Sequence, residues 1–261
     1  MARLGNIVIS IIVFLFFSCK NNEVKSTSKP SQKIEVTIPK FNKDSAYLYI
    51  QDQVNFGPRV PNSKAHRDCA SYLVNTLTRF GADVTTQSDV VQRFDGHSMN
   101  MTNIIATFNK NAYKRVLLCA HWDSRYIADN DSVDNDMPIL GANDGGSGVG
   151  VLLEIARQIQ SQPLSIGVDI IFFDVEDQGE PNGTINPRPH SWCLGSQYWS
   201  KNPHVTNYFA DYGILLDMVG GKNARFTKEG VSRQFASRII EKVWRIAASN
   251  GYANYFVSEK T

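Results

Sequence analysis

The feature that most constrains the fold is an apolar run of strand length that ends in a row of carboxylates. Residues Val168–Phe173 are almost all apolar, and Asp174–Asp177 follows without a linker. A nearly unbroken apolar run of this length is typical of a strand buried on both faces of a sheet. The acidic residues must then lie at the carboxyl end of a central strand.

Other segments extend this pattern into an alternation of strands and helices. Apolar runs predict further strands at Asn103–Phe108, Val116–Ala120 and Tyr212–Leu216, and we expect the last to be buried. Apolar residues at helical spacing predict helices at Ser63–Phe80, Gly146–Gln160 and Gln234–Ser249. The alternation indicates an α/β protein with an open mixed, mostly parallel sheet and helices on both faces.

Carboxylates follow each of three predicted strands. Asp123 and Asp217 come just after two of them, as Asp174–Asp177 does after the central strand, and Asp144 lies in a glycine-rich turn that enters a helix. Ligands bind at this edge of open α/β sheets. Several carboxylates gathered there repel one another unless protons or a cation compensate them. The simplest compensation is a divalent metal ion.

Each of these acidic residues also has an ordinary structural explanation. Asp144 before a helix is most often an N-cap, and the pair Glu176–Asp177 is more often a solvated loop. Asp217 can likewise be a capping or loop residue. Only the coincidence of carboxylates at successive strand ends favours a functional site.

Composition excludes several classes of protein. The 261 residues include 27 Lys+Arg and 25 Asp+Glu, so the formal net charge is +2, and 42% of the residues are hydrophobic. This is ordinary globular composition, which excludes disordered and fibrous chains. A charge so close to zero gives no reason to expect nucleic acid as a partner.

The first residues are typical of an export signal. Arg3 precedes the apolar stretch Ile7–Phe17, which is shorter than the roughly 20 residues that span a bilayer, and Ser18-Cys19 resembles a lipoprotein processing site. We therefore expect a signal peptide over residues 1–18, with Cys19 as a lipidated mature N-terminus, or an ordinary secretory peptide cleaved nearby. Residues 19–40 are polar and predict a flexible tether, and residues 41–261 form the predicted catalytic α/β domain.

Two further features predict structural roles. Without Cys19, the remaining cysteines are Cys69, Cys119 and Cys193, which we expect to be small buried residues. The acidic stretch Asp129–Asp136 does not fit an EF-hand and is expected to be a solvated, mobile loop.

Several segments together resemble the M28 zinc aminopeptidase superfamily. They are, in chain order, His121–Ser124, Gly141–Gly148, Phe172–Asp177, Gly195-Ser196 and Leu215–Asp217. Within that superfamily the chain is most similar to the glutaminyl cyclases (glutaminyl-peptide cyclotransferases) of animal and bacterial type. The similarity extends from about Asn55 to Phe226 and includes the segment Leu216–Phe226.

This resemblance implies a role for each matching residue. Asp144 corresponds to the first zinc ligand, and Asp177 to the second, where the animal enzymes have Glu. Glu176 occupies the position of the carboxylate that transfers protons. Asp217 matches an Asp that cyclases use in a hydrogen-bond relay and that aminopeptidases use to bind a second zinc. His121 occupies the position of a His that binds this second zinc in the dizinc aminopeptidases. In cyclases the His is kept, but a single zinc is expected.

Two parts of the family's site are not matched directly. The family's third zinc ligand, a His that follows a Trp, is expected beyond Thr261, so we expect the catalytic domain to be truncated at its C-terminus. His190 and His204 are expected to be exposed loop residues rather than replacements for that ligand. Trp192 is the expected wall of a small apolar pocket for a glutamine side chain, although a packing role under its loop is equally open.

The resemblance predicts a zinc-dependent glutaminyl-peptide cyclotransferase, an acyltransferase that converts N-terminal glutamine of peptides or proteins to pyroglutamate and releases ammonia. Two alternatives stay open: a dizinc aminopeptidase that releases N-terminal amino acids, and a lipid-anchored binding module without activity. We expect an exported, periplasmic or membrane-anchored monomer that contacts the membrane only through its lipid.

Overall fold

The computed structural model describes residues 38–260, whose compact unit begins at Pro39. The predicted signal peptide, Cys19 and most of the tether lie outside the described residues and stay predictions. No helix in the described part of the chain has the length and apolar character needed to cross a bilayer.

The helices are α1 (Lys43–Asn55), α2 (Lys64–Arg79), α3 (Gly146–Ser161), α4 (Leu194–Lys201) and α5 (Gly230–Ser249). The strands are β1 (Asp83–Gln92), β2 (Ser98–Phe108), β3 (Arg115–His121), β4 (Gly167–Phe173), β5 (Tyr212–Leu215), β6 (Phe226–Lys228) and β7 (Phe256–Lys260).

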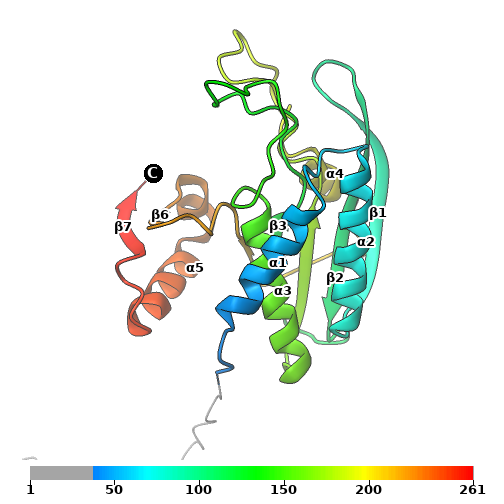
Figure 1. Cartoon of the computed structure of the whole chain (residues 1–261). Coiled ribbons are helices and arrows are strands. Elements are labelled where there is room, and N and C mark those ends of the chain that lie inside the picture. Colours follow the sequence, from blue (N-terminus) through cyan, green and yellow to red (C-terminus); the bar gives the residue numbers. More distant parts are fainter. Residues whose placement is uncertain (1–37, 261) are drawn as a thin grey trace, which may run out of the picture. The chain divides into compact units, whose positions relative to one another are not determined.

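Five strands form a mixed sheet in the order β1-β2-β4-β3-β5 (Figure 1). The β1–β2 and β2–β4 pairs are antiparallel, whereas β3 is parallel to both β4 and β5. All seven residues of β4 are buried, which confirms the central strand predicted from its apolar run. The predicted open mixed α/β sheet is therefore confirmed.

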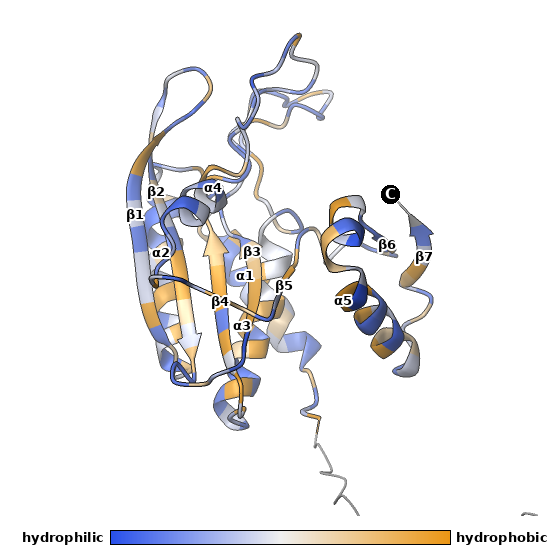
Figure 2. Ribbon diagram, turned by 180° about the vertical axis from the view of Figure 1, so that it is seen from behind, coloured by the Kyte–Doolittle hydropathy of each residue, from blue (hydrophilic) through white to orange (hydrophobic). Residues whose placement is uncertain are grey.

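Helices cover both faces of this sheet. On one face, apolar side chains of α2 and α3 pack against β2, β3 and β4, and α1 packs on α3. On the other face, Trp199 of α4 packs against Ile105, Cys119 and Ile171. Figure 2 shows the hydrophobic colouring concentrated on β3 and β4, between these layers. The prediction of helices on both faces is confirmed.

The structure differs from the sequence expectations at several elements. The predicted strand at Tyr212–Leu216 exists as β5, but its residues alternate between half-buried and exposed, because β5 pairs with β3 alone in the described sheet. The expectation that this strand is buried was wrong. The helix predicted at Gln234–Ser249 begins four residues earlier, at Gly230, where the side chain of Glu229 accepts the first free N–H groups. Cys69 and Cys119 are buried as expected, whereas Cys193 is only partly buried.

Candidate active site

The parallel strands bring their carboxyl ends to one edge of the sheet. β3 ends at His121, β4 is followed by Asp174–Asp177, and β5 is followed by Leu216 and Asp217. Asp144 reaches the same edge from the turn that enters α3. Residues that lie far apart in the sequence therefore converge where an α/β sheet binds its ligands.

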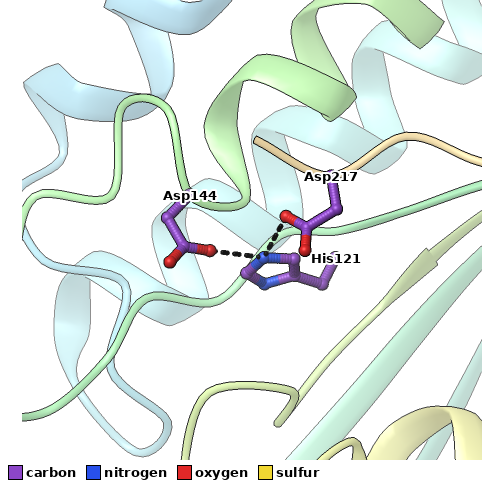
Figure 3. Close-up of side chains that lie close together, drawn as sticks. All are labelled: His121, Asp144 and Asp217. Atoms are coloured by element: carbon purple, nitrogen blue, oxygen red, sulfur yellow. Dashed lines mark hydrogen bonds and ion pairs between the residues drawn. The ribbon is translucent and has the colours of Figure 1, made fainter. Parts of the chain in front are cut away.

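His121 is the centre of this group. Its Nε2 lies 2.9 Å from Asp144 Oδ1 and 3.4 Å from Asp217 Oδ1. Figure 3 marks both contacts with dashed lines. One ligand atom from each of these three residues lies within 4.8 Å of the other two. Burial disfavours the charged imidazolium, but hydrogen bonds to Asp123, Asp144 and Asp217 outweigh it and raise the pKa of His121 well above its usual value. An imidazole and two carboxylates at this spacing can hold a divalent metal ion.

Asp123 is a buried carboxylate that contacts both His121 and the loop after β4. It is fully buried, and its carboxylate lies 3.3 Å from His121 Nδ1, which directs Nε2 toward Asp144. The same carboxylate accepts the backbone N–H groups of Glu176 at 3.1 Å and Asp177 at 3.2 Å. Gln178 donates its side-chain amide to it at 3.0 Å. A carboxylate that orients an imidazole in this way is typical of the outer shell of a metal site.

The Glu176–Asp177 pair is not the solvated loop of the alternative explanation. Burial and the nearby negative charge of Asp123 raise the pKa of Glu176 to about 7 and that of Asp177 to about 8. A hydrogen bond with Asp177 is among the interactions that lower the pKa of Asp144, after the hydrogen bond with His121. The carboxylates of Asp144 and Asp177 therefore lie close together.

These residues fit a divalent cation. Asp177 Oδ2 is shielded from solvent and has no hydrogen-bond partner among the described residues. Leaving a buried carboxylate oxygen unpaired is costly unless another group compensates it. Carboxylate and imidazole are both zinc ligands, so a cation between Asp144 and Asp177 would satisfy this atom and relieve the repulsion.

Asp174 belongs to the acidic row after β4 but not to the site. It is fully buried and lies 2.9 Å from Nε2 of His66 through Oδ2, and the same atom accepts the backbone N–H of Thr102. The next residue, Val175, has a positive φ of 54°, which few β-branched residues adopt. This left-handed residue interrupts the alternation of the strand, so Asp174 contacts His66 whereas Glu176 borders the cavity beside Cys119 and Cys193.

Asp144 is held beside His121 by a glycine. Gly145 has φ of 80°, and a Cβ there would lie 2.8 Å from the carbonyl oxygen of Asp123 and 3.0 Å from the ring of His121. Only glycine combines this backbone conformation with this close approach. Gly145 is also the N-cap of α3, without a side-chain capping bond, so the N-cap explanation of Asp144 is wrong.

Asp217 is positioned by a latch on the start of α3. The backbone N–H of Val219 donates to Ser147 Oγ at 2.9 Å, and that of Gly220 donates to Asn143 Oδ1 at 2.8 Å. Ser147 Oγ in turn donates to the carbonyl of Asn143 at 2.6 Å. Asn143 and Ser147 flank Asp144, so the latch joins the segment that carries Asp217 to the segment that carries Asp144.

The predicted pocket wall, Trp192, lies next to the Glu176 loop. The backbone N–H of Cys193 donates to the carbonyl of Glu176 at 3.0 Å, and Trp192 is 37% exposed. Trp192 is therefore neither free nor fully buried. A cavity of about 350 Å³ also opens beside Glu176, between Cys119, Phe173 and Cys193.

The other aromatic and histidine predictions have mixed outcomes. Trp122, between His121 and Asp123, is fully buried and stacks on His66. His190 is exposed as expected. His204 is not an exposed loop residue, because its ring accepts the indole N–H of Trp199 at 3.1 Å and stacks on that indole. This contact accounts for His204 without a metal.

Comparison with known proteins decides the family. The model of peptidase family M28 matches residues 103–260, more than half of the chain. The chain belongs to peptidase family M28. A solved structure described as a Zn-dependent exopeptidase from Parabacteroides distasonis is 53% identical to this M28 chain, with a TM-score of 0.84, over 86% of this chain and 78% of the other.

Relatives named for cyclisation are similar over much of this M28 chain. The structure of Tannerella forsythia glutaminyl cyclase is 53% identical, with a TM-score of 0.83, over 85% of this chain and 77% of the other. A Drosophila melanogaster protein named glutaminyl-peptide cyclotransferase is 27% identical over 77% of this chain and 56% of its own length. The chain thus spans about half of the length of the curated relatives that it matches.

Proposed function

We propose that the full-length protein is a metal-dependent glutaminyl-peptide cyclotransferase. The observation that carries this proposal is the 53% identity to Tannerella forsythia glutaminyl cyclase over 85% of the chain. The geometry supports it, because the carboxylates and the imidazole that the resemblance assigns to the site converge at one edge of the sheet. The substrates would be peptides or proteins that begin with glutamine.

We assign the metal to zinc, with Asp144 and Asp177 as ligands from this part of the chain. Asp177 has a buried oxygen without a hydrogen-bond partner among the described residues, as such a role requires, and its carboxylate lies close to that of Asp144. When bound, zinc supplies a Lewis acid that polarises the γ-carbonyl of the glutamine and stabilises negative charge on its oxygen.

The residues of the chain carry the proton transfers. In the reaction the α-amine forms a bond to its own γ-amide carbon, and the bond from that carbon to the amide nitrogen breaks, which releases ammonia. The amine must lose one proton, and the leaving nitrogen must gain one. Glu176 is the residue that we assign to both transfers, because it precedes Asp177 on the same loop. A single carboxylate that first accepts and then donates the proton balances the reaction.

Asp217 and Trp192 complete the proposed site. Asp217 lies 3.4 Å from His121 Nε2, so it can take part in a hydrogen-bond relay at the edge of the metal site. Trp192 would limit the pocket for the glutamine side chain and exclude water that would otherwise hydrolyse the amide. Its partial exposure beside the Glu176 loop is compatible with that role.

One observation favours a second candidate function, that of a dizinc aminopeptidase. His121, Asp144 and Asp217 have ligand atoms within 4.8 Å of one another. The resemblance places His121 and Asp217 at the second zinc of M28 aminopeptidases and Asp144 at the first. The geometry of the three residues is therefore compatible with either one or two metal ions.

An assay of the zinc-loaded full-length protein separates the two functions. A peptide with N-terminal glutamine should lose ammonia while its chain length stays the same by mass spectrometry. Peptides with N-terminal leucine or alanine should remain uncleaved. Release of free amino acids from these peptides, without ammonia from the glutamine peptide, would overturn the cyclase proposal in favour of the aminopeptidase.

A further inference from the structure

Arg125 lies at the centre of a hydrogen-bond network beside the proposed site. It is 7% exposed and follows the His121–Ser124 segment at the end of β3. Its Nη1 donates to the backbone carbonyls of Asp177 at 2.9 Å and Gly179 at 3.3 Å. Its Nη2 donates to the carbonyl of Glu180 at 3.2 Å. A single guanidinium thus binds three carbonyls of the loop that carries Asp177.

The remaining donors of Arg125 bind a carboxylate. Nε donates to Asp129 Oδ1 at 2.9 Å, and Nη2 donates to Asp129 Oδ2 at 2.6 Å. This pair lowers the pKa of Asp129 to about 2. Asp129 also accepts the backbone N–H of Asn182 at 2.8 Å. The expectation that Asp129 belongs to a solvated, mobile loop was therefore wrong.

The flat face of the same guanidinium holds Trp192. The carbon Cζ of Arg125 lies 4.5 Å from the centre of the indole. Gly179 also contacts this indole, since a Cβ at that position would lie 2.1 Å from Trp192 Cε2. Trp192 is thus fixed by Arg125 and by the backbone segment whose carbonyls Arg125 binds.

We propose that Arg125 is a positioning residue that holds the Asp177 loop and the Trp192 indole as one unit. All five N–H donors of its guanidinium point to acceptors in the loop or to Asp129, and the Trp192 indole packs on its flat face. Lysine has neither the planar fork nor the face, so it cannot replace these contacts. The inference rests on the proposed function, because it assigns Asp177 and Trp192 to the metal and the glutamine side chain.

The test compares Arg125→Lys with the wild-type full-length protein, and uses Arg157→Lys as a matched control. Arg157 also binds a buried carboxylate through two donors, that of Glu154 on α3, which also accepts the backbone N–H of Asn42 at the start of α1. Hydrogen exchange with mass spectrometry reads the backbone amides of residues 176–182. In Arg125→Lys their exchange should accelerate about tenfold, because hydrogen bonds to a charged group are lost. In Arg157→Lys it should not change.

A spectroscopic readout tests the contact with Trp192. The difference between each protein and its Trp192→Phe variant isolates the fluorescence of that indole. In Arg125→Lys, acrylamide should quench this difference signal more strongly than in the wild-type protein or in Arg157→Lys. Millimolar guanidinium should reverse part of the change in Arg125→Ala, because it restores the planar cation.

The outcomes keep the inference separate from the proposed function. On a glutamine-initiated peptide, Arg125→Lys should raise KM more than it lowers kcat if Trp192 lines the pocket. The inference would be overturned if the exchange of amides 176–182 and the quenching of Trp192 were both unchanged in Arg125→Lys. This holds whatever the activity of the variant. A wild-type protein that does not cyclise glutamine would overturn the proposed function. Hydrogen exchange and acrylamide quenching would still test whether Arg125 positions the Asp177 loop and Trp192. If Arg125→Lys does not fold, Asp129→Asn should give a smaller acceleration over residues 176–182, and no acceleration would overturn the inference.

Discussion

The carboxylate of Asp123 accepts the backbone N–H of Glu176 at 3.1 Å, although the two residues lie 53 positions apart in the chain. The same carboxylate orients His121 through Nδ1. One buried side chain thus fixes both the imidazole after β3 and the loop after β4. A single buried anion thus joins the segments that follow the two paired strands.

Asp123→Asn should weaken metal binding more than it weakens the fold. The amide keeps the size of the side chain but cannot accept from the imidazole and two backbone N–H groups together. Loss of such an outer contact typically lowers metal affinity 10–100-fold, and we expect a decrease of that size for zinc. Competition with a chromogenic chelator measures it.

Asp169→Asn is the control for that variant. Asp169 is also buried, and it accepts hydrogen bonds from Arg115 at 2.8 Å and from the hydroxyl of Tyr208 at 2.8 Å. It should cost about as much unfolding free energy as Asp123→Asn while zinc affinity stays that of the wild-type protein. Equal zinc affinities in both variants would show that Asp123 is only a packing residue.

Metal content should respond differently to Asp144→Asn and Asp217→Asn. Asp144 is next to both His121 and Asp177, so its loss should abolish zinc binding at micromolar concentration. In a cyclase with one zinc, Asp217→Asn should leave the number of bound ions at one. Elemental analysis after equilibrium dialysis gives these numbers. A fall from two ions to one in Asp217→Asn would indicate the dizinc site of an aminopeptidase.

Glu176→Gln should remove proton transfer and preserve the fold. General acid–base catalysis typically contributes 10²–10⁴-fold, so turnover of a glutamine-initiated peptide should fall by about that factor. Zinc content and the melting temperature should stay near those of the wild-type protein. Glu180→Gln, four residues along the same loop, should retain activity, because its carboxylate accepts the backbone N–H of Arg188, outside the proposed site, and its backbone bond to Arg125 is kept. Near-normal turnover in Glu176→Gln would exclude this residue from the mechanism.

Acid stability should depend on Glu154, which lies outside the site. Burial of Glu154 opposes its ionisation, but hydrogen bonds from Arg157, Gln158 and the backbone of Asn42 outweigh burial and lower its pKa. A lowered pKa in the folded state means that the stabilisation is complete above the unfolded pKa of about 4.3. It is lost as the pH falls through the lower folded-state pKa.

Glu154→Gln tests this dependence by urea unfolding between neutral pH and acid. At pH 7 the variant should lose about 2 kcal/mol of unfolding free energy, since hydrogen bonds to a charged group disappear. Its stability should decline less than that of the wild-type protein below pH 4. Glu241→Gln, which affects an exposed pair with Lys228, should change little. Parallel pH curves for Glu154→Gln and the wild-type protein would contradict the prediction.

Much of the fold could be predicted because apolar periodicity reports burial. β4 and α3 follow such patterns directly. β1 was missed because it is a mostly exposed edge strand with polar residues, which has little apolar alternation to detect. α1 was missed because one of its two buried positions is Gln53, a polar residue whose amide donates to the carbonyl of Gly146.

The site was predictable only as a set of residues at strand ends. The spacing of His121 and Asp123 by two positions puts both side chains on one face of an extended segment, and in the structure they are in contact. The alternation of side chains along a strand could not show that Asp174 lies outside the site. The positive φ of Val175 interrupts that alternation directly after β4. Nor could any local pattern show Arg125 against Trp192, since that contact depends on the tertiary fold.

The latch formed by Asn143 and Ser147 connects the segment that carries Asp144 to the segment that carries Asp217 through the backbone of Val219 and Gly220. Asp144 and Asp217 stand on segments joined by short hydrogen bonds, so their separation is set during folding. The proposed zinc ligand Asp144 and the proposed relay residue Asp217 are therefore held at a set separation by the backbone around the start of α3, in addition to their contacts with His121. A substitution at Asn143 or Ser147 would shift the relay residue relative to the ligand without removing either carboxylate.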